Sequence, residues 1–340
     1  MVQRDPANRD PARRPTMSDI AAHVGVSKAL VSLVLRDAPG PSEATREKVV
    51  RAAEELGYRS NRSASLLALH RTRMLGVVLS VRSAFHAELV EEIHAAADEA
   101  GYDVVLGALT RTHDERRAVE NLLGFRCEAL LLLGPEAPSA LLTEFGEQLP
   151  VVVVGRRSRS AAVDVVRAAD DDGVVQAVQH LVDLGHRDIV HVDGGSGTIA
   201  ADRRRGYRKA VRRNGIAERI VSGAYTEEAG ADAARALLAA GELPAAIVAA
   251  NDRCAIGALD VLMRNGIDVP GRVSVVGYDD SALARLSHLD LTSVSQEAAA
   301  QARNAVAAAV ERLDGGRTEP RSLVVPPRLV VRSTTAAPAG

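Results

Sequence analysis

From residue 74 onward the sequence alternates short apolar runs with amphipathic stretches, and this alternation constrains the fold more than any other feature. Apolar runs of strand length predict strands at 75–79, 103–106, 129–133, 151–154, 188–192, 245–249, 273–276 and 323–325. Helical periodicity predicts helices at 88–100, 114–123, 171–184, 202–214, 228–240, 252–265 and 296–313. Such alternation is typical of parallel sheets covered by helices on both faces. There are more strands than one open sheet usually holds, so we expect an α/β core of two lobes over 74–333.

The chain before residue 59 has helical periodicity without strand alternation. Helices are predicted at 17–24, at 27–35 and from Ser42 to Leu56. The sequence therefore divides into parts, which we predict as a disordered tail (1–15), an all-α headpiece (16–58), a connecting segment (59–73), the core and a short tail (334–340). Within the core, we expect an N-terminal lobe from 74–166 with 295–322, and a C-terminal lobe from 167–294 with 323–333.

Charge is distributed unevenly along the chain. The first 73 residues carry 13 of the 42 Lys and Arg residues but only 8 of the 44 Asp and Glu residues, whereas the rest of the chain is acidic. A basic block on an acidic body indicates a polyanionic partner for that block alone.

Several classes of protein are excluded or disfavoured. The two cysteines, Cys127 and Cys254, are too few for a disulfide scaffold or a cysteine zinc site, and we expect both to be buried thiols. The apolar runs are far shorter than the roughly 20 residues that span a bilayer, and the charged N-terminus has no apolar signal segment. The glycine-rich loop 194–197 lacks the Lys-Ser/Thr of a P-loop. We therefore expect a cytoplasmic protein that is not an enzyme, with no membrane contact, cofactor or metal.

The segment 17–35 has the pattern of a helix–turn–helix. Ala21 is small where two helices would cross, Gly25 supplies the turn, Val26 packs inside and Ser27 caps the second helix. In this motif the second helix lies in the major groove of DNA. The candidate DNA-contacting residues are Ser18, Ser27, Lys28, Ala29, Ser32 and Leu33. For this segment taken alone, an ordinary helical hairpin is the alternative.

Further motifs follow the helix–turn–helix in a fixed order. They are 41–49 (Pro-Ser-Glu-Ala-Thr-Arg-Glu-Lys-Val), 52–58 (Ala-Ala-Glu-Glu-Leu-Gly-Tyr), 184–187 (Leu-Gly-His-Arg), 203–207 (Arg-Arg-Arg-Gly-Tyr), 250–252 (Ala-Asn-Asp), 255–258 (Ala-Ile-Gly-Ala) and 275–280 (Val-Val-Gly-Tyr-Asp-Asp). Together these motifs resemble the lactose-repressor (LacI/GalR) family of bacterial transcription regulators over 16–333. The chain departs from that family at Leu30 and Leu33, where the family usually has Thr and often has Arg or His. Because Leu33 cannot hydrogen-bond to a base edge, Lys28 becomes the main candidate for direct base contact.

The resemblance implies that 59–73 forms a hinge helix that orders on the operator. Family hinges wedge a leucine into the minor groove and kink the duplex. By position that leucine is Leu67, with Asn61 and Ala64 as further DNA contacts. Ser60 and Ser65 stand where the family has Pro and Arg, which leaves the strength of the contact open. A solvated linker is the alternative.

The resemblance also implies a core like a periplasmic sugar-binding protein, with a ligand between two lobes. Arg203, Asn251 and Asp279 match the recurrent polar positions, and the rings against the ligand are Tyr225 and either Phe85 or His86. An Arg fork opposite carboxylate and amide groups suits a polyhydroxyl ligand. The residues alone leave other roles open: Asp252 and the run 170–172 as helix caps, and Asp279 with Asp280 as a turn.

These observations predict a DNA-binding transcriptional regulator, most simply a repressor. We expect it to bind a pseudo-palindromic double-stranded operator as a homodimer or a tetramer, and to be switched by a small-molecule effector such as a sugar. The alternative is a solute-binding protein that does not regulate DNA.

Overall fold

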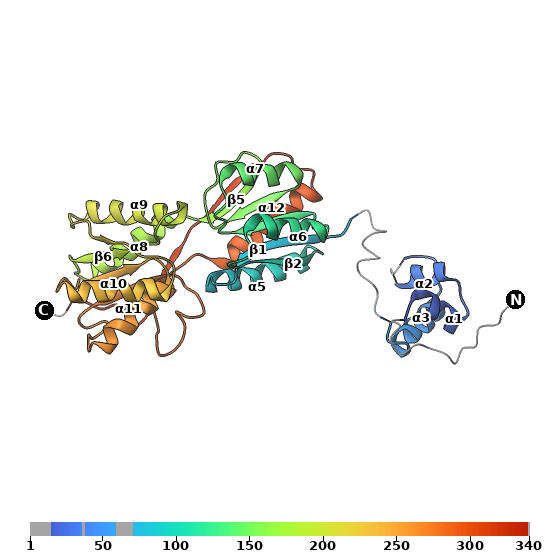
Figure 1. Ribbon diagram of the computed structural model, residues 1–340, viewed down its shortest axis with the longest axis horizontal. Helices are drawn as coiled ribbons and strands as arrows, with labels where there is room; N and C mark the ends of the chain where they lie inside the picture. The colour runs from blue at the N-terminus through green and yellow to red at the C-terminus, as the bar shows by residue number, and fades with distance from the viewer. Residues whose placement is uncertain (1–14, 36–37, 59–70, 339–340) are drawn as a thin grey trace. The chain divides into compact units, whose positions relative to one another are not determined.

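The computed structural model describes residues 15–35, 38–58 and 71–338. The chain forms two compact units, Met1–Arg71 and Thr72–Gly340 (Figure 1). The predicted tail 1–15, apart from Pro15, and most of the predicted hinge lie outside the described residues, and so do its proposed DNA contacts Asn61, Ala64 and Leu67.

The first unit contains the predicted three helices, α1 (Met17–Val24), α2 (Lys28–Leu35) and α3 (Glu43–Glu55). Local signals set their ends. The Asp19 carboxylate accepts hydrogen bonds from the backbone N–H and the hydroxyl of Thr16, each at 2.7 Å. Gly25 ends α1 with a φ of +74°, a conformation that glycine adopts without strain. The helices pack on a small core of Ile20, Ala21, Val31, Val34, Val49, Ala52 and Ala53.

The second unit has two sheets, and the first forms the N-terminal lobe. Its strands are β1 (Met74–Ser80), β2 (Asp103–Leu109), β3 (Ala129–Leu133), β4 (Val151–Val154), β5 (Asp164–Ala168) and β11 (Ser322–Val325). They run parallel in the order β11-β5-β4-β3-β1-β2. The helices of this lobe are α5 (Ala84–Glu99), α6 (Glu115–Gly124), α7 (Ser139–Gln148) and α12 (Ala298–Leu313).

The second sheet forms the C-terminal lobe. Its strands are β6 (Ile189–Val192), β7 (Ile220–Val221), β8 (Ala246–Ala249), β9 (Ser274–Asp279), β10 (Ser293–Ser295) and β12 (Arg328–Val330). The order is β12-β10-β9-β8-β6-β7, and only β12 is antiparallel to its neighbour. Hydrophobic clusters on its two faces involve α8 (Asp170–Asp183) and α9 (Thr198–Arg213) on one side, and α10 (Glu227–Ala239) and α11 (Asp252–Arg264) on the other.

The predicted α/β core of two lobes is confirmed, but one boundary between the lobes was wrong. The chain passes between the sheets after β5, between β10 and α12, and between β11 and β12. Residues 323–325 were assigned to the C-terminal lobe, whereas β11 pairs with β5 in the N-terminal lobe. The last crossing therefore falls at residues 326–327, because strand pairing and not local pattern decides which sheet an apolar run joins.

The predicted tail 334–340 was also wrong in its first residues. Thr334 is 5% exposed, and its hydroxyl donates to the Val275 carbonyl at 2.7 Å. The Ala336 N–H donates to the Ser274 hydroxyl at 3.1 Å, and the Ala336 carbonyl lies 2.8 Å from Nε2 of His186. This segment is therefore held against the C-terminal lobe by its hydrogen bonds.

Candidate functional site

Arg203 is the centre of a buried polar group in the C-terminal lobe. It lies on α9 and is 4% exposed. Its Nε donates to Oδ1 of Asp170 at 2.9 Å, and its Nη1 donates to the Ala250 carbonyl at 2.5 Å. Its Nη2 lies 3.7 Å from Oδ1 of Asp279, which is longer than a hydrogen bond. Among the described residues, Nη2 therefore has an ion-pair partner at 3.7 Å, whereas Nε and Nη1 each donate a hydrogen bond.

Two tyrosine rings flank this guanidinium. Its carbon lies 3.6 Å from the ring centroid of Tyr278 and 5.7 Å from that of Tyr225, both within the range of cation–π attraction. The Tyr278 hydroxyl donates to the Asp170 carbonyl at 3.4 Å. A Cβ on Gly173 would lie 2.5 Å from that hydroxyl, so only glycine at this position leaves room for the ring.

Burial and neighbouring charges shift the pKa values of this group. Burial raises the pKa of Asp279 to about 8, although the Arg203 charge opposes the rise. Burial likewise raises the pKa of Asp170. Burial alone would lower the pKa of Arg203, but Asp170 and the other neighbours outweigh it and raise the value. Arg203 thus keeps its charge, while Asp279 is able to hold a proton near neutral pH.

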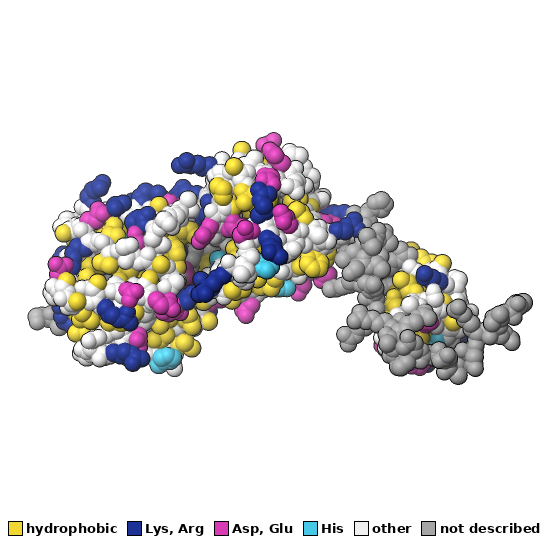
Figure 2. All heavy atoms as spheres, in the orientation of Figure 1, with side chains coloured by type: hydrophobic (Ala, Val, Ile, Leu, Met, Phe, Trp, Pro, Cys, Tyr) yellow, Lys and Arg dark blue, Asp and Glu magenta, His cyan; other side chains and the backbone are white. Residues whose placement is uncertain are grey.

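Arg203 differs from the other cations of its helix. Figure 2 shows Lys and Arg side chains gathered over α9 on the outer face of the lobe. The exposed members of that helix are Arg205, Arg208, Lys209, Arg212 and Arg213. Lys209, for example, pairs with Asp172 at 3.6 Å with both side chains 60% exposed, a contact that solvent weakens.

Asn251 and Tyr225 lie next to this group. Asn251 is the N-cap of α11, where its Oδ1 accepts from the Cys254 N–H at 2.9 Å. Its Nδ2 donates to the Tyr225 carbonyl at 3.5 Å. The Tyr225 hydroxyl is buried with no hydrogen-bond partner within the described residues, and burial raises its pKa to about 12. The structure therefore brings Arg203, Tyr225, Asn251 and Asp279 close together.

The two ring residues of the N-terminal lobe have different surroundings. Phe85 is 6% exposed and packs in the hydrophobic core between α5 and α12, which leaves little of its ring for a ligand. His86 is partly buried, and its Nδ1 accepts from the Ser80 N–H at 3.1 Å. Burial lowers the pKa of His86 to about 4, so the imidazole is neutral. Of the two rings, that of His86 is the less deeply packed in the hydrophobic core.

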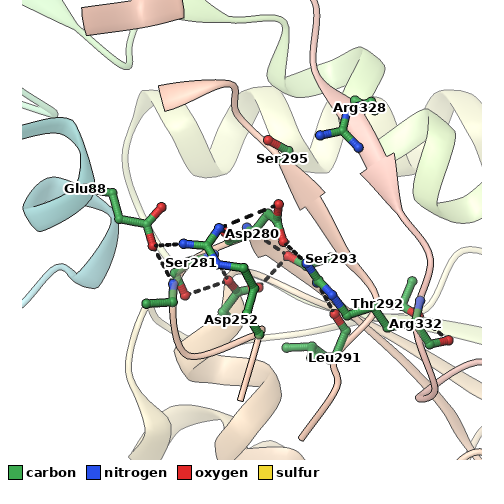
Figure 3. Close-up of polar contacts among 12 residues, drawn as sticks. Glu88, Asp252, Asp280, Ser281, Leu291, Thr292, Ser293, Ser295, Arg328 and Arg332 are labelled. Carbon is green, nitrogen blue, oxygen red and sulfur yellow. Dashed lines mark hydrogen bonds and ion pairs between the residues drawn. The ribbon is translucent and has the colours of Figure 1, made fainter. Parts of the chain in front are cut away.

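Asp252 and Asp280 hold the loop that follows β9 (Figure 3). Asp252 accepts from the Ser281 N–H and hydroxyl at 2.7 and 2.8 Å, and from the Ser293 hydroxyl at 2.5 Å. Asp280 pairs with Arg332 at 2.5 Å. Asp252 thus anchors this loop to β10 rather than simply capping a helix, and burial raises its pKa to about 6.

A pocket of about 290 Å³ opens between the lobes beside this loop. In Figure 3 Glu88 reaches from α5 toward the loop, and its Oε1 lies 2.9 Å from Nη2 of Arg285. The pocket is lined by Glu88, Glu91, Glu92, Asp279, Asp280, Arg285, Ser295, Glu297, Ala298, Ala299 and Arg328. Because Asp279 lines it, the pocket reaches the edge of the polar group around Arg203.

The headpiece exposes most of the predicted DNA contacts. Ser18, Ser27, Lys28 and Ala29 are exposed, whereas Ser32 and Leu33 are partly buried. The Ser27 hydroxyl accepts from the Leu30 N–H at 3.2 Å and caps α2, as predicted. The exposed end of α2 is therefore its N-terminal end, from which a helix in a groove contacts bases.

Within the described residues, no group of three or more His, Cys, Asp or Glu side chains could hold a metal ion. No single described helix is long and apolar enough to cross a membrane, and one bent pair, α1 with α2, passes by length and composition only. Cys127 and Cys254 are buried free thiols, as expected.

Both units of the chain match known protein families. Residues 16–61 match the family described as bacterial regulatory proteins, lacI family, and residues 178–335 match the periplasmic binding protein-like domain. The chain is 34% identical over 335 residues to the HTH-type transcriptional regulator CelR of Thermobifida fusca, which covers 95% of this chain and 98% of that protein. The chain belongs to the LacI family.

Solved structures of LacI-family proteins have the same architecture. A LacI transcriptional regulator from a Rhodococcus species has a TM-score of 0.75 at 44% identity, covering 78% of this chain and 98% of that one. The lac repressor dimer bound to operator and the anti-inducer ONPF has a TM-score of 0.82 at 29% identity, covering 96% and 100%. A CelR–cellobiose complex has a TM-score of 0.69 at 32% identity, covering 94% and 100%. This LacI-family chain is thus a DNA-binding transcriptional regulator, and its named relatives are regulators and not enzymes.

Two residues of the polar group around Arg203 were not predicted from the sequence. Asp170 was interpreted only as an acidic residue at the start of a helix; it does lie in the first turn of α8, but its carboxylate also pairs with Arg203. Gln296 was not considered, although its Nε2 donates to Oδ1 of Asp279 at 2.6 Å. Asp170 lies two residues after the end of β5, at a sheet edge where ligand sites form, but β5 was not predicted, so the sequence carried no signal for it.

Proposed function

We propose that the protein binds a pseudo-palindromic operator as a homodimer, and that a small polyhydroxyl effector in the cleft of the core switches this binding. The observation that carries the effector site is the guanidinium of Arg203, held by Asp170 with one nitrogen, Nη2, left 3.7 Å from Asp279. The lac repressor dimer on its operator and the CelR–cellobiose complex support the two halves of the proposal by analogy.

The proposed effector contacts are Arg203, Asn251, Asp279, Tyr225 and His86. Arg203 supplies donors, and Asp279 supplies an acceptor that also donates when it is protonated. The Tyr225 hydroxyl lacks a partner within the described residues, so a ligand hydroxyl would satisfy it. Paired donors and acceptors in a buried cleft suit the adjacent hydroxyls of a sugar. Phe85 has the weakest support because it is a core residue.

The proposed DNA contacts are those of the headpiece, with Lys28 as the main base-contacting residue. Lys28 is exposed at the start of α2, and the N-terminal residues of such a helix contact base edges in the major groove. The minor-groove contact of Leu67, with Asn61 and Ala64 beside it, remains a proposal from resemblance. A dimer would place two such helices about one helical turn apart, which requires a site of about 14–20 base pairs.

The test begins with DNA. Duplexes selected from a random-sequence library by the full-length chain should contain an inverted repeat, and footprinting should show both half-sites protected. Selection of an asymmetric half-site bound by a monomer would contradict the operator proposal. Failure to select any sequence would favour the alternative of a solute-binding protein without DNA regulation.

The proposed effector site is tested with the same full-length protein. A panel of neutral sugars is screened by thermal shift, and each hit is then measured by calorimetry with the wild type and with Arg203→Ala, Asp279→Ala and the control Arg208→Ala. Arg208 is exposed on the same helix and pairs with Glu218 at 2.8 Å. The site variants should lose binding and still bind the selected duplex, whereas the control should keep both. Wild-type affinity in the Arg203 and Asp279 variants would refute the site.

A further inference from the structure

The first residues of the second unit are held by one carboxylate. Oε1 of Glu128 accepts from the Thr72 N–H at 2.5 Å and from the Arg73 N–H at 3.1 Å. The Thr72 hydroxyl lies 3.4 Å from the same oxygen and donates to the Arg126 carbonyl at 2.7 Å. A single side chain thus binds two consecutive backbone amides just where the chain enters β1.

The strands on either side hold the same segment. The Asp103 N–H donates to the Arg73 carbonyl at 2.9 Å, and the Glu128 N–H donates to the Met74 carbonyl at 2.8 Å. Arg73 has a φ of +49°, and its guanidinium lies 5.5 Å from the ring centroid of Tyr102. A positive φ at a residue other than glycine costs free energy, so the contacts around it must compensate for that cost. The contacts of Glu128 with the Thr72 and Arg73 amides are among those that offset this cost.

We propose that Glu128 is a positioning residue for DNA binding: it fixes the direction in which the chain leaves the core toward the headpiece. This inference rests on the proposed function, in which two headpieces of one dimer occupy one operator. Binding of the second headpiece depends on its effective concentration at the second half-site, which a freer tether lowers. Release of the Thr72 and Arg73 amides frees the backbone of about two residues that must be ordered again on the operator.

Loss of the Glu128 contacts should therefore change the affinity for two kinds of DNA to different degrees. A full inverted repeat requires both headpieces in register, so loss of the Glu128 contacts should weaken its binding about tenfold, in line with the ordering cost of one or two residues. A single half-site requires one headpiece, so its affinity should stay within about twofold. A role of Glu128 that is only structural would not distinguish the two duplexes.

The experiment uses the full-length chain with Glu128→Ala, Glu128→Gln and the control Glu120→Ala. Glu120 is exposed on α6 in the same lobe. Affinity for the selected inverted repeat and for one of its half-sites is measured by fluorescence anisotropy, and exchange of the Thr72 and Arg73 amides by hydrogen–deuterium exchange. We expect faster exchange and about tenfold weaker binding of the full repeat for Glu128→Ala. Gln retains an acceptor at the same reach, so its loss should be about two- to threefold, and Glu120→Ala should match the wild type.

The inference is overturned if Glu128→Ala binds the full repeat as the wild type does while its amides exchange faster. Equal losses on the full repeat and the half-site would also overturn it. Should Glu128→Ala fail to fold, Glu128→Gln decides by the same two comparisons. Failure of the wild type to bind the repeat as a dimer would refute the proposed function instead, so the two failures can be told apart.

Discussion

Nε of Arg203 lies 2.9 Å from Oδ1 of Asp170, and the two side chains are 4% and 1% exposed. An ion pair removed from water to this degree adds little net stability, because the loss of hydration offsets the attraction. Its effect is positional: Asp170 holds the guanidinium at one end, and the other end remains directed at Asp279. The pair joins α8 to α9 and thereby prepares the C-terminal lobe for a ligand.

Although the intact pair adds little net stability, replacing Asp170 alone with Ala should destabilise the protein strongly. The buried charge of Arg203 would lose its nearest partner, which typically costs about 3–5 kcal/mol. The matched control is Asp172→Ala, since Asp172 follows on the same helix and is 60% exposed, and its effect should stay within about 0.5 kcal/mol. Urea unfolding of the full chain measures both. A loss below about 1 kcal/mol for Asp170→Ala would mean that Arg203 finds another partner.

Replacing Asp279 with Asn should change how stability depends on pH. The pKa of Asp279 is raised from 3.8 to about 8 by burial, so its contribution to stability is fully present below pH 3.8 and is lost as the pH rises through 8. Asn carries no charge to bury, so its stability should not fall in this way. The free energy of unfolding of the variant minus that of the wild type should therefore rise between pH 5 and pH 9, by about 1 kcal/mol or more. Chemical unfolding at these two pH values measures the gain. A constant difference would contradict it.

His191 should make the protein sensitive to acid. It is fully buried, its Nδ1 lies 2.9 Å from the Val248 carbonyl, and burial lowers its pKa from 6.5 to about 4. Its contribution to stability is present above pH 6.5 and is lost as the pH falls through 4, by at most about 3 kcal/mol. Unfolding measured from pH 7 to pH 4 should show a smaller loss for His191→Phe, which keeps a ring against Tyr207. The matched surface control is His94→Phe, at an exposed position on α5.

Two glycine substitutions should have opposite effects. A Cβ on Gly173 would lie 2.5 Å from the Tyr278 hydroxyl and 2.9 Å from Cγ1 of Val294, so Gly173→Ala should cost about 1–3 kcal/mol. A Cβ on Gly124, in α6, would meet no atom within 4 Å, so Gly124→Ala should stabilise by about 0.4–1 kcal/mol. Thermal unfolding compares the two variants. Equal effects would show that the ring of Tyr278 moves without cost.

Binding of the selected duplex should weaken steeply with salt. If three or four cations of each headpiece contact phosphates, a dimer neutralises about six to eight, and log K should fall with log salt at a slope of about −5 to −7. Lys28→Ala should weaken specific binding by about 1–3 kcal/mol for each lost base contact. If Lys28 contacts a base, the variant should also tolerate more bases at one position of each half-site. Anisotropy titrations over a salt series, with point-substituted duplexes, measure both effects. A slope near zero would contradict the DNA-binding role of the headpiece.

Sequence by itself determined the features that depend on nearby residues. Both ends of α1 and the start of α2 follow from Thr16, Gly25 and Ser27, whose bonds span at most a few positions. The bounds of β3 and β4 follow from uninterrupted apolar runs, which a strand buried on both faces requires. The order of the family motifs predicts that Arg203, Asn251 and Asp279 serve one site, and the structure brings them close together.

Only the tertiary structure decided the features whose partners lie far away along the chain. β5 was not predicted because it contains Asp164 and Arg167, yet it is fully buried since Arg317 pairs with Asp164 at 2.8 Å from 153 positions away. β11 joins the N-terminal lobe because its edge pairs with β5. Asp170 looks like a helix cap until α9 brings Arg203 against it. In each case the stabilising partner is absent from the local sequence, so no local pattern could have revealed it.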